Sequence, residues 1–238
     1  MKMINGQYIT GGYNLDIGMI IDLTGSMSPF LNTVKAHAQR LVDLIFERME
    51  DAGKSIDQLR LRIIGFRDYK YDGDKAMVES PVFVLPQDKE AFQEFLNGLE
   101  ATGGGDAPEN GLEAMAMTMR WFQEVYDSSI NRNILIGFTD TNTHALHDPE
   151  CAKNPLYPAD MPKDMAELVA CWHGTNQTPY TMPYPRIGRM VLYSPEVEPW
   201  TTLASQANTW HEAIKLNEGV RETNIDSIAD LIVNSTCA

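Results

Sequence analysis

Three aspartates occupy positions at which this chain could bind a hard cation. Asp22 and Asp140 each end a short apolar run of the kind that forms a buried parallel strand, and Asp106 precedes a segment with helical periodicity. The carboxyl ends of parallel strands line the binding crevice of an open α/β sheet, so we expect these carboxylates at one edge. Thr24 and Ser26 follow Asp22 with a spacing of two residues, which allows both hydroxyls to point the same way. Carboxylate and hydroxyl oxygens without Cys or His favour Mg²⁺, with Mn²⁺ or Ca²⁺ as alternatives.

The segments around these residues alternate between strand and helix patterns. This alternation predicts an α/β fold with a doubly wound, mostly parallel sheet flanked by helices. We expect a single domain at residues 13–238 after an N-terminal extension at residues 1–12. Asp106 and Glu109 resemble the capping box with which a helix begins. The expected strands are at residues 13–22, 59–66, 81–85, 133–138, 187–193 and 219–221, and the expected helices at residues 28–53, 88–99, 106–126, 163–172, 200–216 and 224–232.

The composition restricts the classes of partner. The 238 residues include 19 Lys and Arg against 33 Asp and Glu, which gives a net charge of −14, and 43% of the residues are apolar. A chain of this length and apolar content buries a sizeable core. Nucleic acids and anionic membrane surfaces attract clustered Lys and Arg, so the charge argues against both. If a protein partner is itself acidic, a divalent cation is the obvious bridge between the two surfaces.

The cysteines and the N-terminal residues predict a cytoplasmic protein. Cys151, Cys171 and Cys237 are odd in number and form no CxxC motif, which argues against a disulfide framework or a zinc ribbon. A reducing compartment fits this use of cysteine. The first residues contain no apolar signal region, and the apolar run at residues 15–23 is too short to cross a bilayer.

Several motifs resemble those of von Willebrand factor A (VWA) domains. Residues 22–28, DLTGSMS, resemble the motif that forms the metal-ion-dependent adhesion site in that family. Residues 102–109, TGGGDAPE, are similar to the second metal loop of a branch with a GGGDxPE signature, and residues 138–140, FTD, resemble the third loop. Residues 65–69, GFRDY, together with His144, are most similar to the VWA domains attached to alpha-kinases.

The resemblance implies a protein-binding module rather than an enzyme. A bound cation, Mg²⁺ or else Mn²⁺ or Ca²⁺, would be completed by a carboxylate or similar oxygen of another protein. His144 and Asp68 lie close to the expected metal edge in sequence and are candidate contacts for that partner. Thr102 is an alternative to the aspartate of the second loop, because many VWA domains supply a Thr there. The implied metal ligands are Asp22, Thr24, Ser26 and Asp106, with Asp140 acting directly or through water.

Enzymatic alternatives fit the sequence less well. A Mg²⁺-dependent phosphohydrolase or phosphotransferase could use Asp22 as its nucleophile. Such enzymes usually carry a second Asp two residues later, where this chain has Thr24, and no Lys follows near the third loop to neutralise a phosphate. A nucleotide-binding site at residues 103–105 is less favoured still, because the glycines follow a helix and lack the G-x-G-x-x-G spacing.

A zinc site is a further alternative in the long segment after Asp140. His144, His147, Asp148 and Cys151 follow one another with a loose metal-ligand spacing. The surrounding segment, residues 141–162, is rich in Pro, Asp and Asn, which favours a solvated loop over the metal edge rather than a zinc site.

Overall fold

Strand β3 (Gly12–Asp22) lies at the centre of the sheet because its sequence is almost continuously apolar. All of its residues from Leu15 onward are buried. A strand buried in this way needs paired strands on both edges and helices on both faces. It pairs in parallel with β4 (Ser55–Phe66) on one edge and with β7 (Arg132–Phe138) on the other. The structure is a computed structural model that describes residues 2–4, 7–9, 12–105, 107–130, 132–218 and 225–237.

The sheet extends from these strands in both directions. Beyond β7 lie β8 (Gly188–Pro195) and then β9 (Thr209–Ile214), both parallel to their neighbours. At the other edge, β5 (Met77–Glu79) and β6 (Phe83–Leu85) pair antiparallel with β4. The strand order is β5-β4-β3-β7-β8-β9, with β6 also beside β4. The predicted doubly wound, mostly parallel α/β fold is therefore confirmed.

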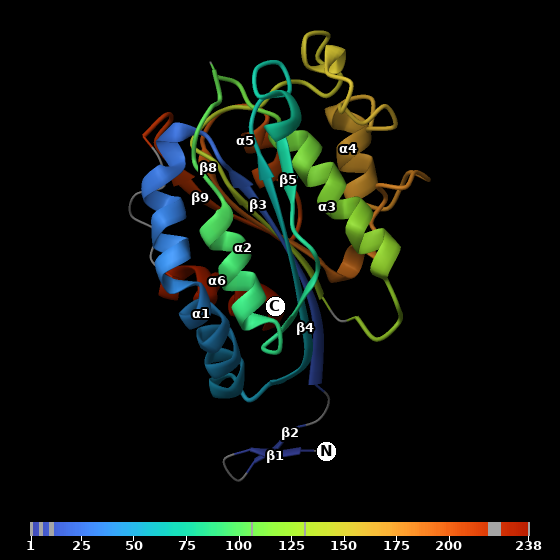
Figure 1. The fold of residues 1–238 in the computed structure, drawn as a ribbon. Coiled ribbons are helices and arrows are strands. Elements are labelled where there is room, and N and C mark those ends of the chain that lie inside the picture. The colour runs from blue at the N-terminus through green and yellow to red at the C-terminus, as the bar shows by residue number, and fades with distance from the viewer. Residues whose placement is uncertain are drawn as a thin grey trace.

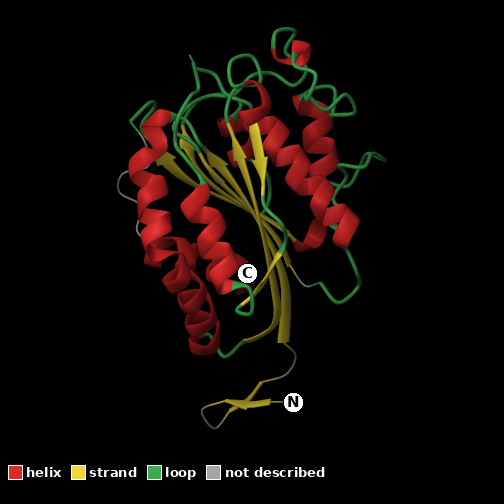
Figure 2. Ribbon diagram, viewed as in Figure 1, coloured by secondary structure: helices red, strands yellow, loops and turns green. Residues whose placement is uncertain are grey.

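Helices cover both faces of this sheet, as the arrangement of red helices around yellow strands in Figure 2 shows. Each helical layer packs its apolar side chains into a separate core. The first layer, labelled in Figure 1, consists of α1 (Ser28–Asp51), α2 (Lys89–Gly98) and α6 (Ile225–Cys237). The second consists of α3 (Gly111–Val125), α4 (Met165–Trp172) and α5 (Trp200–Ala204).

The central strand contributes side chains to both cores in alternation. Ile17 and Ile21 join the core beneath α1, whereas Ile20 joins the core beneath α3. Gly18 faces α3 as well, and a Cβ atom at this position would lie 2.2 Å from Cγ2 of Thr118. The helix therefore packs directly against the backbone of β3.

The segment after β8 differs from the expected helix at residues 200–216. A short helix, α5, ends at Ala204, and the chain turns at Asn208, whose φ is +60°. The next residues form β9, which pairs with the open edge of β8. The prediction of one long helix is wrong. The backbone groups of residues 209–214 form hydrogen bonds with β8, a strand that ends more than ten residues earlier, and a local helical pattern does not reveal this pairing. The strand expected at residues 219–221 lies outside the described residues.

Helix α3 begins five residues later than the sequence indicates. Its first residue is Gly111 and Asn110 occupies the N-cap position, so Glu109 precedes the helix and forms no capping box. The amide of Glu109 donates to the carbonyl of Asn142, and the amide of Asn110 donates to the carbonyl of Arg67. These long-range hydrogen bonds fix the backbone before the helix can start.

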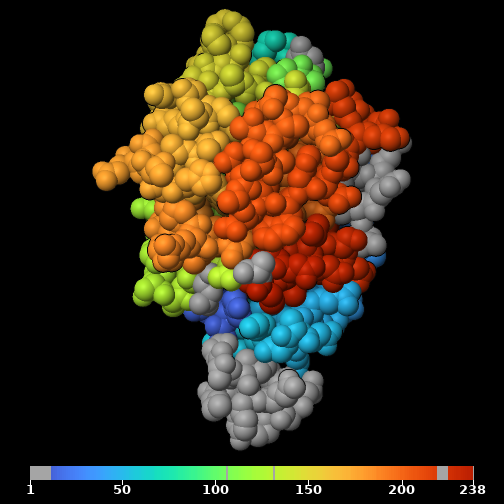
Figure 3. All heavy atoms as spheres, turned by 180° about the vertical axis from the view of Figure 1, so that it is seen from behind, coloured from blue at the N-terminus to red at the C-terminus, as the bar shows by residue number. Residues whose placement is uncertain are grey.

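The remaining parts of the chain complete this arrangement. Strands β1 (Lys2–Ile4) and β2 (Gln7–Ile9) form a separate antiparallel pair, and the division into an extension and a domain at residue 12 remains a prediction. Seen from behind in Figure 3, the segments that follow β7, coloured gold to red, form most of the surface. Among the described residues, the helices are either too short or too polar to cross a membrane.

Candidate functional site

The carboxylate of Asp22 forms the centre of the candidate site at the carboxyl end of β3. The backbone amide and the hydroxyl of Thr24 both donate to Oδ1 of Asp22, at 2.8 and 2.6 Å. The hydroxyl of Thr139, at the end of β7, donates to the other oxygen at 2.8 Å. Asp22 has no exposed surface. Its two oxygens therefore connect the loop after β3 with the loop after β7.

A second carboxylate, that of Asp140, joins the same network. The hydroxyl of Ser26 donates to Oδ1 of Asp140 at 2.9 Å, and it lies 3.5 Å from the hydroxyl of Thr24. Asp140 is fully buried as well. The structure thus brings together Asp22, Thr24, Ser26 and Asp140, four of the residues expected to bind metal. They come from two parallel strands that are neighbours in the sheet, as the sequence predicts.

The electrostatics of this network fit a divalent cation. Burial is the main cause that raises the pKa of Asp22 to about 6, and the charge of Asp140 raises it further, against the hydrogen bonds from Thr24 and Thr139. Among the described residues, no Lys, Arg or His side chain forms an ion pair with Asp22. Buried carboxylates are costly unless a positive group compensates them. Two carboxylates with two hydroxyls are the oxygen donors that Mg²⁺ prefers.

The glycine-rich loop at residues 102–105 packs against this network. The amide of Thr102 donates to the carbonyl of Leu23 at 2.8 Å, although the residue itself is exposed. Gly104 has a φ of +89°, and a Cβ atom there would lie 2.5 Å from Cγ2 of Thr24 and 2.8 Å from Oε1 of Glu109. Only glycine fits this approach. Asp106, the predicted ligand of this loop, lies outside the described residues.

Glu109 is a residue near the site whose role the sequence did not reveal. Its carboxylate lies against Gly104, which itself contacts Thr24, and the residue is only 3% exposed. Because Glu109 lies three residues after Asp106, the sequence pattern indicated a helix-capping role for it. The structure instead places this third acidic side chain next to the loops that contain Thr24 and Gly104.

The buried guanidinium of Arg67 connects two backbone segments around the site, one at residues 100–102 and the other at Lys75. It donates to the carbonyls of Thr102 at 2.7 Å, Lys75 at 2.7 Å and Glu100 at 2.5 Å. The residue is 5% exposed and follows directly after β4. Arg67 therefore holds the glycine-rich loop at the edge of the sheet.

Asp68, expected to contact a partner, lies in the interior instead. Its carboxylate is 3.3 Å from Nε2 of His144 and 3.5 Å from Sγ of Cys151. Burial lowers the pKa of His144, but the hydrogen bond to Asp68 and the nearby charges outweigh it, so that pKa is raised. Burial, with the charge of Asp68, raises the pKa of the Cys151 thiol to about 12. The expectation of a solvated loop at residues 141–162 is wrong for Cys151, which is completely buried, as is Asp68.

A buried acid next to this cluster gives the protein a pH-dependent stability. The hydroxyl of Tyr157 donates to Glu113 at 2.9 Å, and Glu113 has no exposed surface. Burial raises the pKa of Glu113 to about 7, against this hydrogen bond. The folded state therefore keeps a proton that the unfolded state releases at a lower pH.

We expect Glu113→Gln to flatten the fall in stability with rising pH. The pKa of Glu113 is raised from 4.5 to about 7, so its contribution to the free energy of unfolding is full below pH 4.5 and is lost towards pH 7. The loss amounts to about 3 kcal/mol. Urea unfolding between pH 4.5 and 8 measures it, with Glu124→Gln on the exposed side of α3 as the control. Parallel curves for wild type and Glu113→Gln would show that Glu113 ionises normally.

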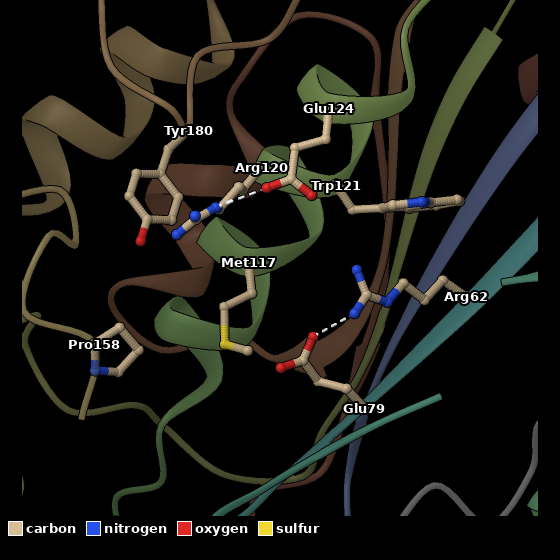
Figure 4. Close-up of a pocket in the computed structure, with 8 residues that line it drawn as sticks. All are labelled: Arg62, Glu79, Met117, Arg120, Trp121, Glu124, Pro158 and Tyr180. Carbon is tan, nitrogen blue, oxygen red and sulfur yellow. Dashed lines mark hydrogen bonds and ion pairs between the residues drawn. The ribbon is translucent and has the colours of Figure 1, made fainter. Parts of the chain in front are cut away.

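A surface pocket of about 280 Å³ lies along α3 and has a different character (Figure 4). Figure 4 shows two ion pairs on its walls, Arg62 with Glu79 at 2.5 Å and Arg120 with Glu124 at 2.9 Å. Its charged groups are thus neutralised within the protein. Its lining residues are Arg62, Glu79, Met117, Arg120, Trp121, Glu124, Pro158 and Tyr180, none of which belongs to the predicted site.

This fold, with buried acidic and hydroxyl side chains at the strand ends, defines a class of domain that sequence comparison identifies. The profile of the von Willebrand factor A domain matches residues 16–150, which is more than half of the chain. The chain therefore belongs to the VWA family.

Similar proteins are known from several sources. An ariadne-like RING finger protein of Acanthamoeba polyphaga mimivirus is 31% identical over 130 residues, covering 55% of this chain and 11% of that protein. The human von Willebrand factor A domain-containing protein 7 is 28% identical over 103 residues, covering 43% of this chain and 10% of that protein. The crystal structure of the pilus adhesin SpaC from Lactobacillus rhamnosus GG matches with a TM-score of 0.54 and 12% identity, covering 97% of this chain and 31% of SpaC.

These comparisons concern the domain and not whole proteins. The matches span about a tenth of the length of the curated relatives. The structural match, at 12% identity, supports the fold alone.

Proposed function

We propose that this VWA domain binds another protein through a divalent cation at the carboxyl ends of β3 and β7. The observation that carries the proposal is the network of two buried carboxylates and two hydroxyls in which Asp22 and Asp140 take part. Thr24 and Ser26 supply the hydroxyl ligands. Asp106 is the proposed ligand from the second loop, with Thr102 as its alternative. Such an arrangement corresponds to the metal-ion-dependent adhesion site of the family, with Mg²⁺ as the favoured cation.

The residues of the site have separate parts in this function. Asp22 is positioned by Thr139 and Asp140 by Ser26, so the carboxylates need little rearrangement on binding. When bound, the cation neutralises these carboxylates and offers an open coordination position to a carboxylate oxygen of the partner. Of the two proposed partner contacts, His144 retains 11% of its side-chain exposure, whereas the side chain of Asp68 is buried and lies 3.3 Å from it.

A binding role accounts for the geometry better than phosphoryl transfer. Both oxygens of Asp22 accept hydrogen bonds, and the residue is completely buried, whereas a nucleophile must reach its substrate. We therefore propose a non-enzymatic module. The similarity of residues 65–69 and His144 to the VWA domains of alpha-kinases supports a place in that branch. The three cysteines, all free thiols, support a cytoplasmic location.

The proposal is tested by capture of partners with two matched baits. Wild-type protein and Asp22→Asn are immobilised and exposed to a cell extract in Mg²⁺, and bound proteins are eluted with EDTA. We expect a protein that binds the wild type only, and whose purified form loses binding when one surface Asp or Glu is replaced. Partner binding that is unchanged by EDTA and by Asp22→Asn would contradict the proposal. Asp22-dependent hydrolysis of p-nitrophenyl phosphate would favour the enzymatic alternative.

A further inference from the structure

Three side chains with the donor atoms of a zinc site converge next to the adhesion site. The ligand atoms of Asp68, His144 and Cys151 all lie within 4.8 Å of one another. They come from the loop after β4, the loop after β7 and the start of a short 3-10 helix at Cys151–Lys153. We propose that these residues bind Zn²⁺ as a second metal site, distinct from the site around Asp22.

The donor set and its spacing both fit zinc. Thiolate and imidazole are ligands that Zn²⁺ binds well and that Mg²⁺ and Ca²⁺ do not select. In a tetrahedral zinc site with bonds of about 2.0–2.3 Å, neighbouring ligand atoms lie roughly 3.3–3.7 Å apart. Oδ2 of Asp68 lies 3.3 Å from Nε2 of His144, and Oδ1 of Asp68 lies 3.5 Å from Sγ of Cys151, so each carboxylate oxygen lies at about this separation from one of the other two ligands. Three protein ligands leave the fourth position to a water molecule.

Polar contacts with neighbouring groups orient each of the three ligands. Oδ2 of Asp148 lies 3.9 Å from Nδ1 of His144, which leaves Nε2 directed at Asp68. A carboxylate behind a histidine ligand is a common feature of zinc sites. Oδ1 of Asp148 also accepts from the amide of Cys151 at 3.2 Å. The amide of Lys70 donates to Oδ1 of Asp68 at 2.7 Å.

The cluster lies where two long segments already meet. The side-chain amide of Asn154 donates to the carbonyls of Tyr69 and Gly73, both at 2.9 Å, and the amide of His144 donates to the carbonyl of Glu109 at 2.8 Å. A metal ion in the cluster would connect the loop after β4 with the loop after β7 directly. Both loops border the site around Asp22, so a bound zinc ion would hold the two loops of the proposed partner-binding surface in one relative position.

Binding requires Cys151 to coordinate as a thiolate. Its proton passes to solvent as the metal–sulfur bond forms, and no oxidant or reductant takes part. The proposed adhesion site contains only oxygen donors. The two sites are therefore distinguished by the metals they prefer, and the failure of one proposal leaves the other testable.

Cobalt(II) alone serves as the spectroscopic probe. Protein treated with EDTA and desalted is titrated with Co²⁺ and the visible and near-ultraviolet spectrum is recorded. We expect one equivalent to produce tetrahedral cobalt bands and a thiolate-to-cobalt charge-transfer band, both removed by one equivalent of Zn²⁺. Asp148→Asn is expected to weaken Co²⁺ binding by about 10–100-fold, because Asp148 positions the ligands His144 and Cys151 without binding the metal itself.

Matched variants decide the assignment. Cys151→Ser is expected to abolish the charge-transfer band, whereas Cys171→Ser, which changes another fully buried thiol, is expected to retain it. Asp22→Asn is also expected to retain it, because that residue belongs to the other site. Circular dichroism verifies that each variant is folded. No charge-transfer band with folded wild-type protein, or a band that persists in Cys151→Ser, would overturn the proposal.

Discussion

In saturating Mg²⁺ the wild-type domain is expected to unfold about 5–10 °C higher than in EDTA, and Asp22→Asn is expected to abolish this difference. A ligand that binds only the folded state at a hundredfold excess over its Kd adds about 2.7 kcal/mol to the free energy of unfolding. For a domain of this size each kcal/mol shifts the midpoint by about 2–4 °C. Asp22 is the central acceptor of the site, so its neutral amide cannot replace it.

The expected behaviour of Asp22→Asn without metal separates loss of the site from loss of the fold. Burial and the charge of Asp140 make ionised Asp22 unfavourable, as its raised pKa shows. Replacing it with a neutral amide is therefore expected to leave stability in EDTA unchanged or higher. Thermal unfolding followed by circular dichroism at pH 8, with Mg²⁺, Mn²⁺, Ca²⁺ or EDTA, measures both quantities.

Asp16→Asn provides a matched control on the same strand. Asp16 is equally buried but lies towards the other end of β3, where it pairs with Arg60 at 2.6 Å. Removal of its charge leaves a guanidinium without a carboxylate partner, so we expect lower stability with an intact response to Mg²⁺. A lost response in Asp16→Asn, or a retained response in Asp22→Asn, would refute the assignment of the site.

The second large effect is expected for Arg67→Ala. The guanidinium of Arg67 donates to three backbone carbonyls, those of Glu100 and Thr102 in one segment and Lys75 in another. Truncation leaves these carbonyls without their charged donor, and each buried acceptor left unpaired costs about 1–3 kcal/mol. Because water can enter the space and pair with some of them, we expect a total loss of about 3–5 kcal/mol.

The same substitution is expected to weaken cation binding, because Thr102 begins the glycine-rich loop that packs against Thr24. Urea unfolding in EDTA measures the stability, and a Mg²⁺ titration of the unfolding midpoint measures the affinity. Arg120→Ala is the control, since its ion pair with Glu124 is on the surface and is expected to contribute less than about 1 kcal/mol. Equal losses for the two variants would mean that Arg67 does not hold the loop.

The sequence alone determined the fold class and the edge of the sheet at which the candidate residues meet. The apolar runs that became β3, β4, β7 and β8 are long enough to identify as buried strands without knowledge of their neighbours. In a parallel sheet their carboxyl ends must share one edge. Asp22, the last residue of β3, and Asp140, just after β7, were therefore placed together correctly, because strand direction and local apolar pattern suffice for that inference.

Only the tertiary structure decided which polar residues surround the site and how. Glu109 and β9 form backbone hydrogen bonds with segments that are distant in sequence. Because of these hydrogen bonds neither is helical, although the local sequence pattern indicates a helix. Asp68 meets residues 76 and 83 positions later in the chain, His144 and Cys151. Each of these segments looks like a solvated loop when it is considered alone. Their burial results from packing between loops, and the free energy of such contacts depends on both partners, so neither segment's own sequence can reveal it.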